Sequence, residues 1–434
     1  MRRRPLAVGA MLAATALLVT ACGGGGSSSG SGAGAAALDG VGPITLVQGK
    51  DTSNFVQGRL DAWNAQHPDQ KVTLIELPED ADAQRSQMIQ NANAKSDAYD
   101  VLAVDNVWTA EFAANRYIVE LPQDQFPQTA DFLPPVIDSA KYKDKLFAIP
   151  YASDGGLLYY RTDLLKAAGI TDPPKTWTEM QADCTKIAAT PAGAGVNCYA
   201  GQFQKYEGLT VNFAEAVNSS GGVITDSQGK PDVNTPQAKA GLDFLVNAFK
   251  SGEIPKEAIT YKEEEARRAF QEGKLVFERQ WPYMYTLAEK TDGSSKVAGK
   301  FAVSPLPGLT GPGVSSLGGH ALAISTYSKN KKTAADFINF YTSKESNTIQ
   351  VKQASLAPVY TSIYDDTSLQ ATLPYLATLK ASILGAQARP KVVRYGDATL
   401  AIQDAAYGAI QGQMTSDQAL SQLQSKLESL TNGS

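Results

Sequence analysis

Residues 101–121 read VLAVDNVWTAEFAANRYIVEL, an apolar strand that runs directly into a mixed helix. An acid, an amide and an indole stand at the junction, as Asp105, Asn106 and Trp108. Such a cluster is expected where a side chain caps a helix or where a polar ligand binds. Trp108 and Phe112 are four residues apart, so both are predicted to turn inward and anchor the helix.

Two strand-and-helix units precede this stretch and decide the fold class. GPITLVQGKD contains a first strand over 44–47, and helical spacing follows over 53–66. QKVTLIELP alternates as a second strand, and a polar helix follows it over 80–95. This β-α-β-α-β order predicts an α/β fold with a largely parallel sheet and helices on both faces.

The remainder of the chain alternates less regularly. An apolar strand over 145–154 is interrupted at Pro150, and GGLLYYRTDLLKAAGI reads as another strand that leads into a short helix. Further helices are predicted over 236–250, 261–272, 331–343, 366–383 and 395–412, and further strands over 274–281, 300–308 and 316–325.

The N-terminus carries an export signal. Three arginines precede an apolar run of about 17 residues without an acid, the pattern of a signal peptide over 1–21. LVTAC resembles a bacterial lipobox, in which Cys22 becomes lipidated; a signal peptide that merely contains a cysteine is the alternative. The Gly/Ser-rich residues that follow predict a flexible tether over 22–42.

Charge argues against nucleic acid as a partner. The chain has 39 Lys and Arg against 44 Asp and Glu, and a formal net charge of −5. Cleavage of the signal peptide would remove three arginines and no acid, which takes the net charge to −8. An acidic chain without basic runs is not typical of a nucleic-acid binder.

Two cysteines remain after Cys22, at Cys184 and Cys198. Outside the cytoplasm these two are expected to form a disulfide. A metal site is the weaker alternative, because neither His67 nor His320 lies in ligand spacing with a cysteine. We expect no metal and no cofactor.

Signatures of catalysis fail when their context is considered. GSSSG at 26–30 fits a nucleophile elbow, but it lies in the tether and has no strand before it. The chain contains no phosphate-binding loop, no H-E-x-x-H and no strand-placed dinucleotide motif. We therefore expect no enzyme. An extracellular glycosidase stays an alternative, because it needs only two carboxylates.

Polar residues follow the first two strands, where open α/β sheets bind ligands. Asp51, Ser53 and Asn54 follow the first strand and are candidate ligand contacts. Helix capping by Asp51 or Ser53 is an equal alternative, and the two roles can coexist. Glu79 and Asp80 follow the second strand, where capping is the favoured role.

Acids and aromatic rings follow the later strands. Asp105 follows the third strand, and Asp154 stands next to two glycines in YASDGG. RQWPYMY places Trp281, Tyr283 and Tyr285 after another strand. Carboxylates that accept from hydroxyl groups, beside rings that cover C–H faces, are typical of carbohydrate binding. We expect Tyr285 in the core and Trp281 in the site.

The chain resembles the extracellular solute-binding proteins of ABC sugar importers, in the maltose/trehalose-binding group. The resemblance covers nearly all of residues 43–430, and VDNVWTAEF is closest to trehalose-binding lipoproteins. It rests on the lipobox together with the order and spacing of residues 99–121, 145–170, 173–180, 269–285, 317–325 and 388–405.

This resemblance implies a two-lobed, periplasmic-binding-protein-like fold with several hinge crossings and a ligand cleft between the lobes. One lobe would hold 43–150 and 307–343, and the other 151–306 and 344–434. The contacts carried over by matching stretch are Asp51, Asn54, Asp105, Asn106, Asp154, Glu207, Trp281, Tyr283, Gly318, Gly319 and Arg389.

Each carried-over residue has an implied role. Asp51, Asp105 and Asp154 would accept from sugar hydroxyls, and Trp281 would stack on a sugar ring. Glu207 would contact the ligand from the second lobe, and the two glycines would bring backbone close to it. Arg389 would donate to hydroxyls, with a surface arginine before a proline as the alternative. His320 departs from the pattern of relatives.

The implied function is capture of an α-linked disaccharide of the trehalose or maltose class and its delivery to a membrane permease. The protein would be a monomer, anchored to the outer face of the cell membrane by Cys22. A non-sugar solute is the alternative. A phosphate ligand would need clustered Lys and Arg, and a polyamine would make Arg389 unfavourable.

Overall fold

The structure is a computed structural model that describes residues 37–53 and 55–431. The predicted signal peptide, Cys22, most of the tether and Asn54 lie outside these residues. No helix within the described residues is long and apolar enough to cross a membrane.

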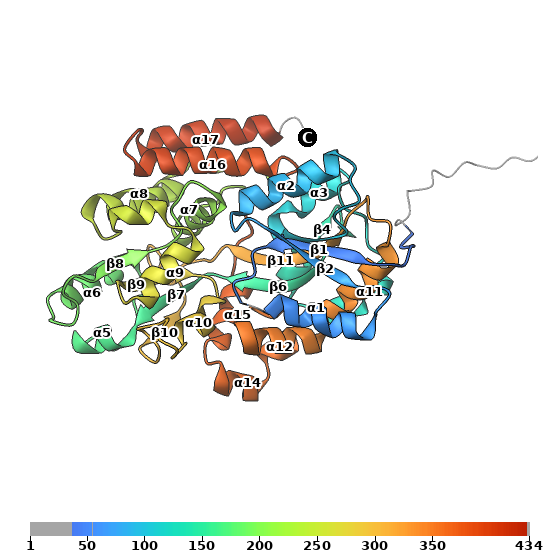
Figure 1. Ribbon diagram of the computed structural model, residues 1–434. Coiled ribbons are helices and arrows are strands. Elements are labelled where there is room, and N and C mark those ends of the chain that lie inside the picture. The colour runs from blue at the N-terminus through green and yellow to red at the C-terminus, as the bar shows by residue number, and fades with distance from the viewer. Residues whose placement is uncertain (1–36, 54, 432–434) are drawn as a thin grey trace, which may run out of the picture. The chain divides into compact units, whose positions relative to one another are not determined.

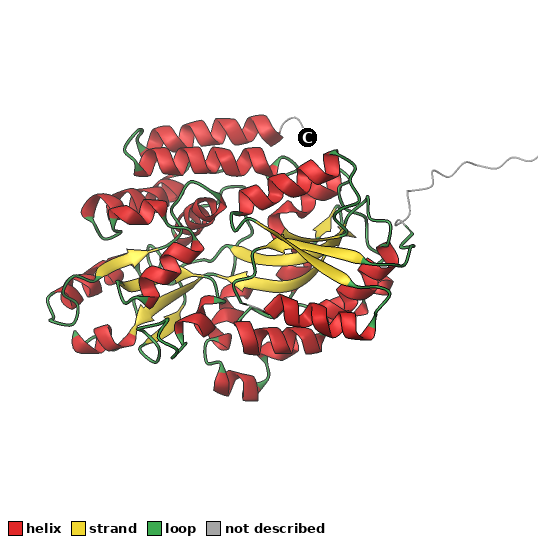
Figure 2. Cartoon of the chain, in the orientation of Figure 1, coloured by secondary structure: helices red, strands yellow, loops and turns green. Residues whose placement is uncertain are grey.

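The first sheet contains the three strands predicted from the N-terminal pattern (Figures 1 and 2). Its order is β2-β1-β3-β11-β6, and β1 pairs in parallel with β2 and β3. The last two strands run antiparallel to their neighbours, so the sheet is mixed at this side. The strands are β1 Ile44–Gly49, β2 Val72–Leu77, β3 Val101–Asp105, β6 Ile149–Gly155 and β11 Leu317–Ile324.

The second sheet has the order β10-β7-β9-β8. Its central pair β7–β9 is antiparallel, and β8 pairs in parallel with β9. Its strands are β7 Leu157–Arg161, β8 Asn197–Ala200, β9 Leu275–Gln280 and β10 Phe301–Ser304, and a separate two-stranded sheet holds β4 Lys141–Tyr142 and β5 Lys145–Leu146.

The predicted strand over 145–154 is wrong in its extent, because two strands share that stretch. β5 ends at Leu146, and β6 begins at Ile149. Pro150 lies inside β6 and not at a break. It faces Ala321 where the register of β6 and β11 shifts, and β6 is the edge strand of its sheet. A proline without an N–H is tolerated at such an irregular edge.

Helices cover both sheets, and several begin where a side chain caps the first turn. Thr176 Oγ1 accepts from Glu179 N at 3.1 Å, and the Glu179 carboxylate accepts from Thr176 N at 3.0 Å. The helices are α1 Phe55–Gln66, α2 Ala81–Asn93, α3 Thr109–Ala114, α4 Pro134–Ser139, α5 Thr162–Ala167, α6 Trp177–Ala188, α7 Glu207–Ser219, α8 Pro236–Ser251, α9 Glu263–Gln271, α10 Met284–Ala288, α11 Lys331–Tyr341, α12 Lys344–Ala354, α13 Thr361–Tyr364, α14 Thr367–Thr372, α15 Leu376–Leu384, α16 Tyr395–Ile410 and α17 Ser416–Thr431.

Two helical predictions near the C-terminus are wrong. The single helix expected over 366–383 is divided into α14 and α15, because Pro374 lies between them and cannot continue α14. The final helix α17 was not predicted, although Leu420, Leu423 and Leu427 lie buried on one face at helical spacing. It packs against α16 and α8 (Figure 1).

The chain passes between the two sheets three times. Gly156 joins β6 to β7, residues 305–316 join β10 to β11, and residues 385–394 join α15 to α16. The three segments contact one another. Gly156 N donates to Ser315 Oγ at 2.6 Å, and Gln387 N donates to Ser315 O at 2.8 Å. This architecture is the two-lobed fold with several hinge crossings. The exact lobe boundaries stay a prediction, and α12 contacts α1 and α11 as well as α10.

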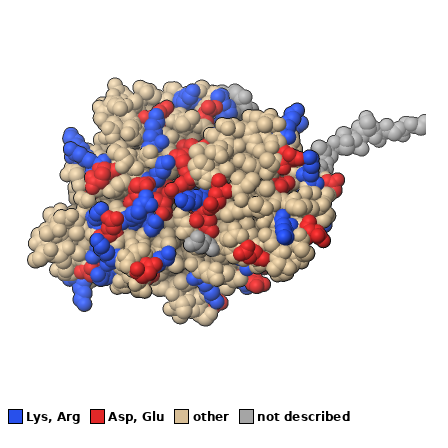
Figure 3. Space-filling view, in the orientation of Figure 1, with Lys and Arg blue, Asp and Glu red and all other residues tan. Residues whose placement is uncertain are grey.

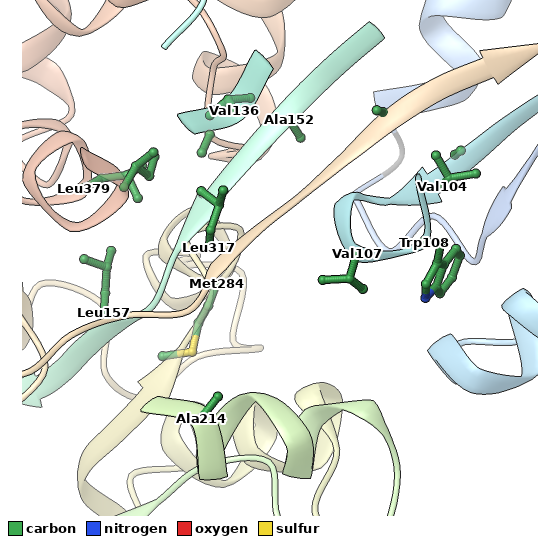
Figure 4. Packing of buried hydrophobic residues seen from close by; sticks show 14 of the residues in the cluster. Val104, Val107, Trp108, Val136, Ala152, Leu157, Ala214, Met284, Leu317 and Leu379 are labelled. Atoms are coloured by element: carbon green, nitrogen blue, oxygen red, sulfur yellow. The ribbon is translucent and has the colours of Figure 1, made fainter. Parts of the chain in front are cut away.

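Trp108 and Phe112 are buried, as their spacing predicts. Trp108 is 1% exposed, and the two rings stack with centroids 6.0 Å apart. Figure 4 labels Trp108 with Val104 and Val107 at the end of β3. The packing of these two rings holds the short helices that follow β3 in place, and it thereby fixes the position of Asp105 at the end of the strand.

The predicted disulfide joins α6 to β8. Cys184 and Cys198 are paired with their Cα atoms 5.4 Å apart, 14 residues apart in sequence. We predict that the double variant Cys184→Ser/Cys198→Ser lowers the free energy of unfolding by about 3 kcal/mol, because the unfolded chain gains entropy. Urea titration of the oxidised protein and the variant measures this change. An unchanged urea midpoint would show that the disulfide does not contribute to the stability of the folded protein.

Candidate functional site

A cavity of about 260 Å³ lies where residues of both sheets meet. Its walls come from the ends of β1, β3 and β6, the start of β11, the start of α7 and the residues after β9. The predicted site residues that line it are Asp51, Asp105, Asp154, Glu207, Trp281, Tyr283, Gly318, Gly319 and Arg389. Residues far apart in sequence therefore meet at one place, as expected for strand ends of an open sheet.

Asp51 both caps a helix and lines the cavity. Its Oδ1 accepts from Ser53 N at 2.8 Å, and its Oδ2 accepts from Val56 N at 3.0 Å. These bonds satisfy amides at the start of α1. Capping by Asp51 is therefore confirmed, and its contact with a ligand stays a prediction that its place in the cavity wall allows.

The two carboxylate oxygens of Asp105 lie in different environments, one bonded to the protein and one without a donor among the described residues. Oδ1 accepts from Val107 N at 3.2 Å, which caps the 3₁₀ helix η1 Asn106–Trp108, and from Arg389 Nη2 at 3.0 Å. Oδ2 has no hydrogen bond to any described residue. The side chain is nearly buried yet lines the cavity, so Oδ2 is available to a ligand hydroxyl.

Arg389 is a buried guanidinium that bridges the two lobes. Its Nη1 donates to Glu207 Oε1, and its Nη2 donates to Asp105 Oδ1 and to Asn106 Oδ1 at 3.2 Å. Asp105 belongs to the first sheet, whereas Glu207 begins α7. A guanidinium that is 4% exposed needs such partners, because an unpaired buried charge is costly.

Two predicted contacts are already engaged within the protein. Glu207 also accepts from Tyr395 and, at 2.7 Å, from Thr399 Oγ1, so protein donors occupy both its oxygens. Burial raises the pKa of Glu207, and Arg389 opposes that rise. Asn106 does not line the cavity; its Nδ2 donates to Leu317 O at 3.1 Å behind the wall.

Asp154 is a cavity acid whose carboxylate has no hydrogen bond to any described residue. It lies at the end of β6 in the cavity wall. Burial raises its pKa to about 7, and the neighbouring Asp105 carboxylate adds to the rise. A ligand that donates hydrogen bonds would find this group unoccupied.

Trp281 presents one face to the cavity and is supported from behind. The Arg279 guanidinium lies 3.8 Å from the ring centroid. Gly318 allows the indole edge to approach β11, because a Cβ there would lie 2.8 Å from Cη2. Gly319 has φ +121, and a side chain on it would meet Ala152 O. Both glycines are therefore required by the local geometry.

Several lining residues were not predicted. Three of them are tyrosines, and Tyr206 could have been found as the neighbour of Glu207 in QKYEGL. The unpredicted aromatic and acidic lining residues are Tyr151, Tyr206, Tyr341, Glu263 and Glu264. The acids belong to α9, where Figure 3 shows both signs of charge gathered.

For Glu79, Asp80 and His320 the sequence leaves open whether they contact a ligand, and the structure shows which of them line the cavity. Glu79 and His320 line the cavity, and burial lowers the pKa of His320. Asp80 does not line it. Its carboxylate caps α2 by accepting from Ala83 N at 3.0 Å, as predicted, and pairs with Lys262 at 2.7 Å. Tyr285 packs against Tyr375 and Phe301, as expected for a core residue.

Comparison with known proteins gives the family. The bacterial extracellular solute-binding proteins match residues 49–348. The chain belongs to this family. A probable ABC transporter-binding protein of Deinococcus radiodurans is 34% identical over 380 residues, which are 85% of this chain and 88% of the relative. The mannitol-binding protein of Pseudomonas aeruginosa is 28% identical and matches 64% of this chain and 63% of its own length.

A solved structure agrees with the family. The maltose-bound T. maritima MalE3 is 31% identical with a TM-score of 0.84, and the match covers 89% of this chain and 99% of that protein. The chain is therefore a substrate-binding component of an ABC-type importer that acts outside the cytoplasm. The family consists of transport proteins and not of enzymes.

The raised pKa of Asp154 predicts a pH-dependent stability. Its value near 7 in the folded protein exceeds that of an unfolded aspartate, about 4. The folded state therefore holds a proton that the unfolded state has lost, and stability falls as the pH rises through this window. We predict that the free energy of unfolding of Asp154→Asn falls less steeply with pH than that of the wild type. At pH 8 the variant should be the more stable of the two, by about 1 kcal/mol or more.

Urea titrations at pH 4.5 and pH 8 measure this difference. The matched control is Asp232→Asn, which changes an exposed aspartate away from the cavity. An Asp154→Asn variant whose stability falls between the two pH values as steeply as that of the control would contradict the assignment.

Proposed function

We propose that this chain captures an α-linked disaccharide of the trehalose or maltose class in the cavity and delivers it to a membrane permease. One observation carries the proposal: free carboxylate oxygens of the first sheet, on Asp105 and Asp154, line the same space as aromatic rings from both lobes. Carboxylates accept from hydroxyl groups, and rings cover the apolar C–H faces of a sugar. The maltose held by the 31% identical relative supports this class of ligand.

The residues divide into ligand contacts and supports. Asp154, Asp51 and the Oδ2 atom of Asp105 are the proposed hydroxyl acceptors, and Trp281 is the proposed stacking platform. Arg389 and Glu207 hold each other and Asp105 in place, so their role is positioning. A ligand that contacts both lobes stabilises the closed form, and the permease would recognise that form.

The anchor and the oligomeric state belong to the same proposal. Cys22 would carry the lipid, and the tether over 22–42 would connect the binding lobes to the outer face of the membrane. Two or more acyl chains give stable attachment to a bilayer. The protein would work as a monomer beside the permease. Metabolic labelling with a fatty acid, compared between wild type and Cys22→Ser, tests the anchor.

A thermal-shift and calorimetry screen tests the ligand class. The panel contains trehalose, maltose, sucrose and palatinose, with mannitol as an open-chain polyol. We predict that an α-linked disaccharide raises the melting temperature, since ligand at 100 times its Kd stabilises a protein by about 2.7 kcal/mol. A shift by mannitol alone would replace the disaccharide with a sugar alcohol, and no response to any sugar would refute the proposal.

Asp105→Ala tests the site. We predict a loss of about 1.5–3 kcal/mol of binding free energy for the sugar found in the screen, as for a hydrogen bond to a charged group. The matched control is Asp366→Ala, because Asp366 also caps a helix through its side chain but does not line the cavity. If Asp105→Ala lowers only the melting temperature and keeps full affinity, its role is capping.

A further inference from the structure

Arg279 stands behind the proposed sugar platform and is not exposed to the cavity. It is 1% exposed, and its guanidinium covers the face of Trp281 at 3.8 Å from the ring centroid. A cation over an indole is a favourable contact, stronger when water is excluded. The position of the ring therefore depends on what holds the guanidinium.

Glu215 of α7 holds the guanidinium in a two-pronged ion pair. Arg279 Nε donates to Glu215 Oε2 at 2.7 Å, and Nη2 donates to Oε1 at 2.6 Å. Nη1 donates to Gln202 Oε1 at 3.1 Å. All three nitrogens of the guanidinium are thus occupied in a fixed plane, which is the geometry that a lysine cannot supply.

The same carboxylate reaches the segments that join the two lobes. Glu215 Oε1 accepts from Ser316 N at 3.1 Å, directly before β11. It also lies next to Gly156, because a Cβ on Gly156 would be 2.7 Å from Oε1 and 2.9 Å from Arg279 Nη2. Figure 4 shows Leu157 and Leu317, the residues that follow the two crossings.

We propose that Arg279 and Glu215 are positioning residues that connect the Trp281 platform to two hinge crossings, so that the position of the ring and the geometry of the hinge are coupled. The path has three direct contacts: indole to guanidinium, guanidinium to carboxylate, and carboxylate to the Ser316 amide. That a sugar occupies the platform rests on the proposed function, but the coupling itself does not.

A merely structural ion pair would stabilise the second lobe without this coupling. The distinction is measurable because Glu215 does not touch the indole, and Trp281 does not touch Ser316 by any contact described above. The indole also approaches Gly318 of β11, two residues after Ser316. Trp281→Phe is therefore compared in the wild-type and Glu215→Gln backgrounds, because an effect on Ser316 that passes through the carboxylate should be lost in the second. Both ends can be observed in the ligand-free protein.

The experiment uses Glu215→Gln, which keeps the shape of the side chain and removes its charge. Hydrogen exchange followed by NMR reports on the Ser316 amide, and the near-UV circular dichroism of Trp281 is isolated by subtracting the spectrum of Trp281→Phe in each background. We expect the Ser316 amide to exchange about tenfold faster, as for the loss of one charged hydrogen bond, and the Trp281 signal to change.

Trp281→Phe supplies the reverse measurement and leaves both charged members of the ion pair, Arg279 and Glu215, in place. We expect faster exchange at Ser316 in this variant as well, so the proposal stays testable if Glu215→Gln folds poorly. The matched control is Asp163→Asn, which breaks the comparable two-pronged pair between Arg161 and Asp163. It should leave both signals unchanged.

Unchanged exchange at Ser316 in Trp281→Phe would overturn the proposal. A Glu215→Gln protein whose Trp281 signal does not differ from that of Asp163→Asn would also overturn it, as would an equal effect of Trp281→Phe on Ser316 exchange with and without the Glu215 carboxylate. Since no sugar is added, these outcomes are independent of the sugar screen. A protein that binds no disaccharide would refute the proposed ligand and leave the coupling to be decided by these two signals.

Discussion

The burial of one guanidinium governs the arrangement of the site. Arg389 cannot be placed in the interior without anionic partners, and it takes them from both lobes, Asp105 on one side and Glu207 on the other. This pairing fixes the end of β3 against the start of α7. The pairing also determines which acids remain available to a ligand. Both carboxylate oxygens of Glu207 accept from protein donors, whereas one oxygen of Asp105 has no donor within the described part of the chain.

The acids of the cavity therefore have unequal roles although their sequence contexts are alike. Asp51, Asp105 and Asp154 each follow an apolar strand. The first uses both oxygens in caps, the second uses one, and the third uses neither within the described residues. Among these three acids, occupancy by protein donors falls from β1 to β6, and burial raises the pKa of the least occupied one, Asp154. Recognition of hydroxyl groups is thus expected to be strongest near Asp154.

Local patterning was sufficient for the first three strands of the first sheet and for much of the cavity, but not for β6 or for the antiparallel pairing of β11. The alternation of strands and helices before Asp105 predicts β1, β2 and β3 in their observed order, and the rule that ligands bind at strand ends selects most of the acids. The helical pairing of Trp108 with Phe112 likewise follows from spacing alone. These features depend on neighbours within a few residues.

Features that depend on distant partners were not accessible in this way. Tyr151 and Tyr341 lie within or beside strands and helices that read as ordinary core, and only the tertiary fold brings them to the cavity. The engagement of Glu207 by Tyr395 and Thr399 spans more than 180 residues. Helix α17 has an apolar face at helical spacing, so this helix could have been predicted from the sequence although it was not.

Pro150 has a consequence for how this protein behaves when many copies stand close together. It lies in β6, the last strand of the first sheet, where an exposed row of amides would invite another chain to pair. Pro150 has no amide to offer, and Ser153 N is given to Ala357 O at 3.1 Å. β6 is also buried over most of its length, so this edge of the sheet is covered by the protein and is not open to pairing with another chain.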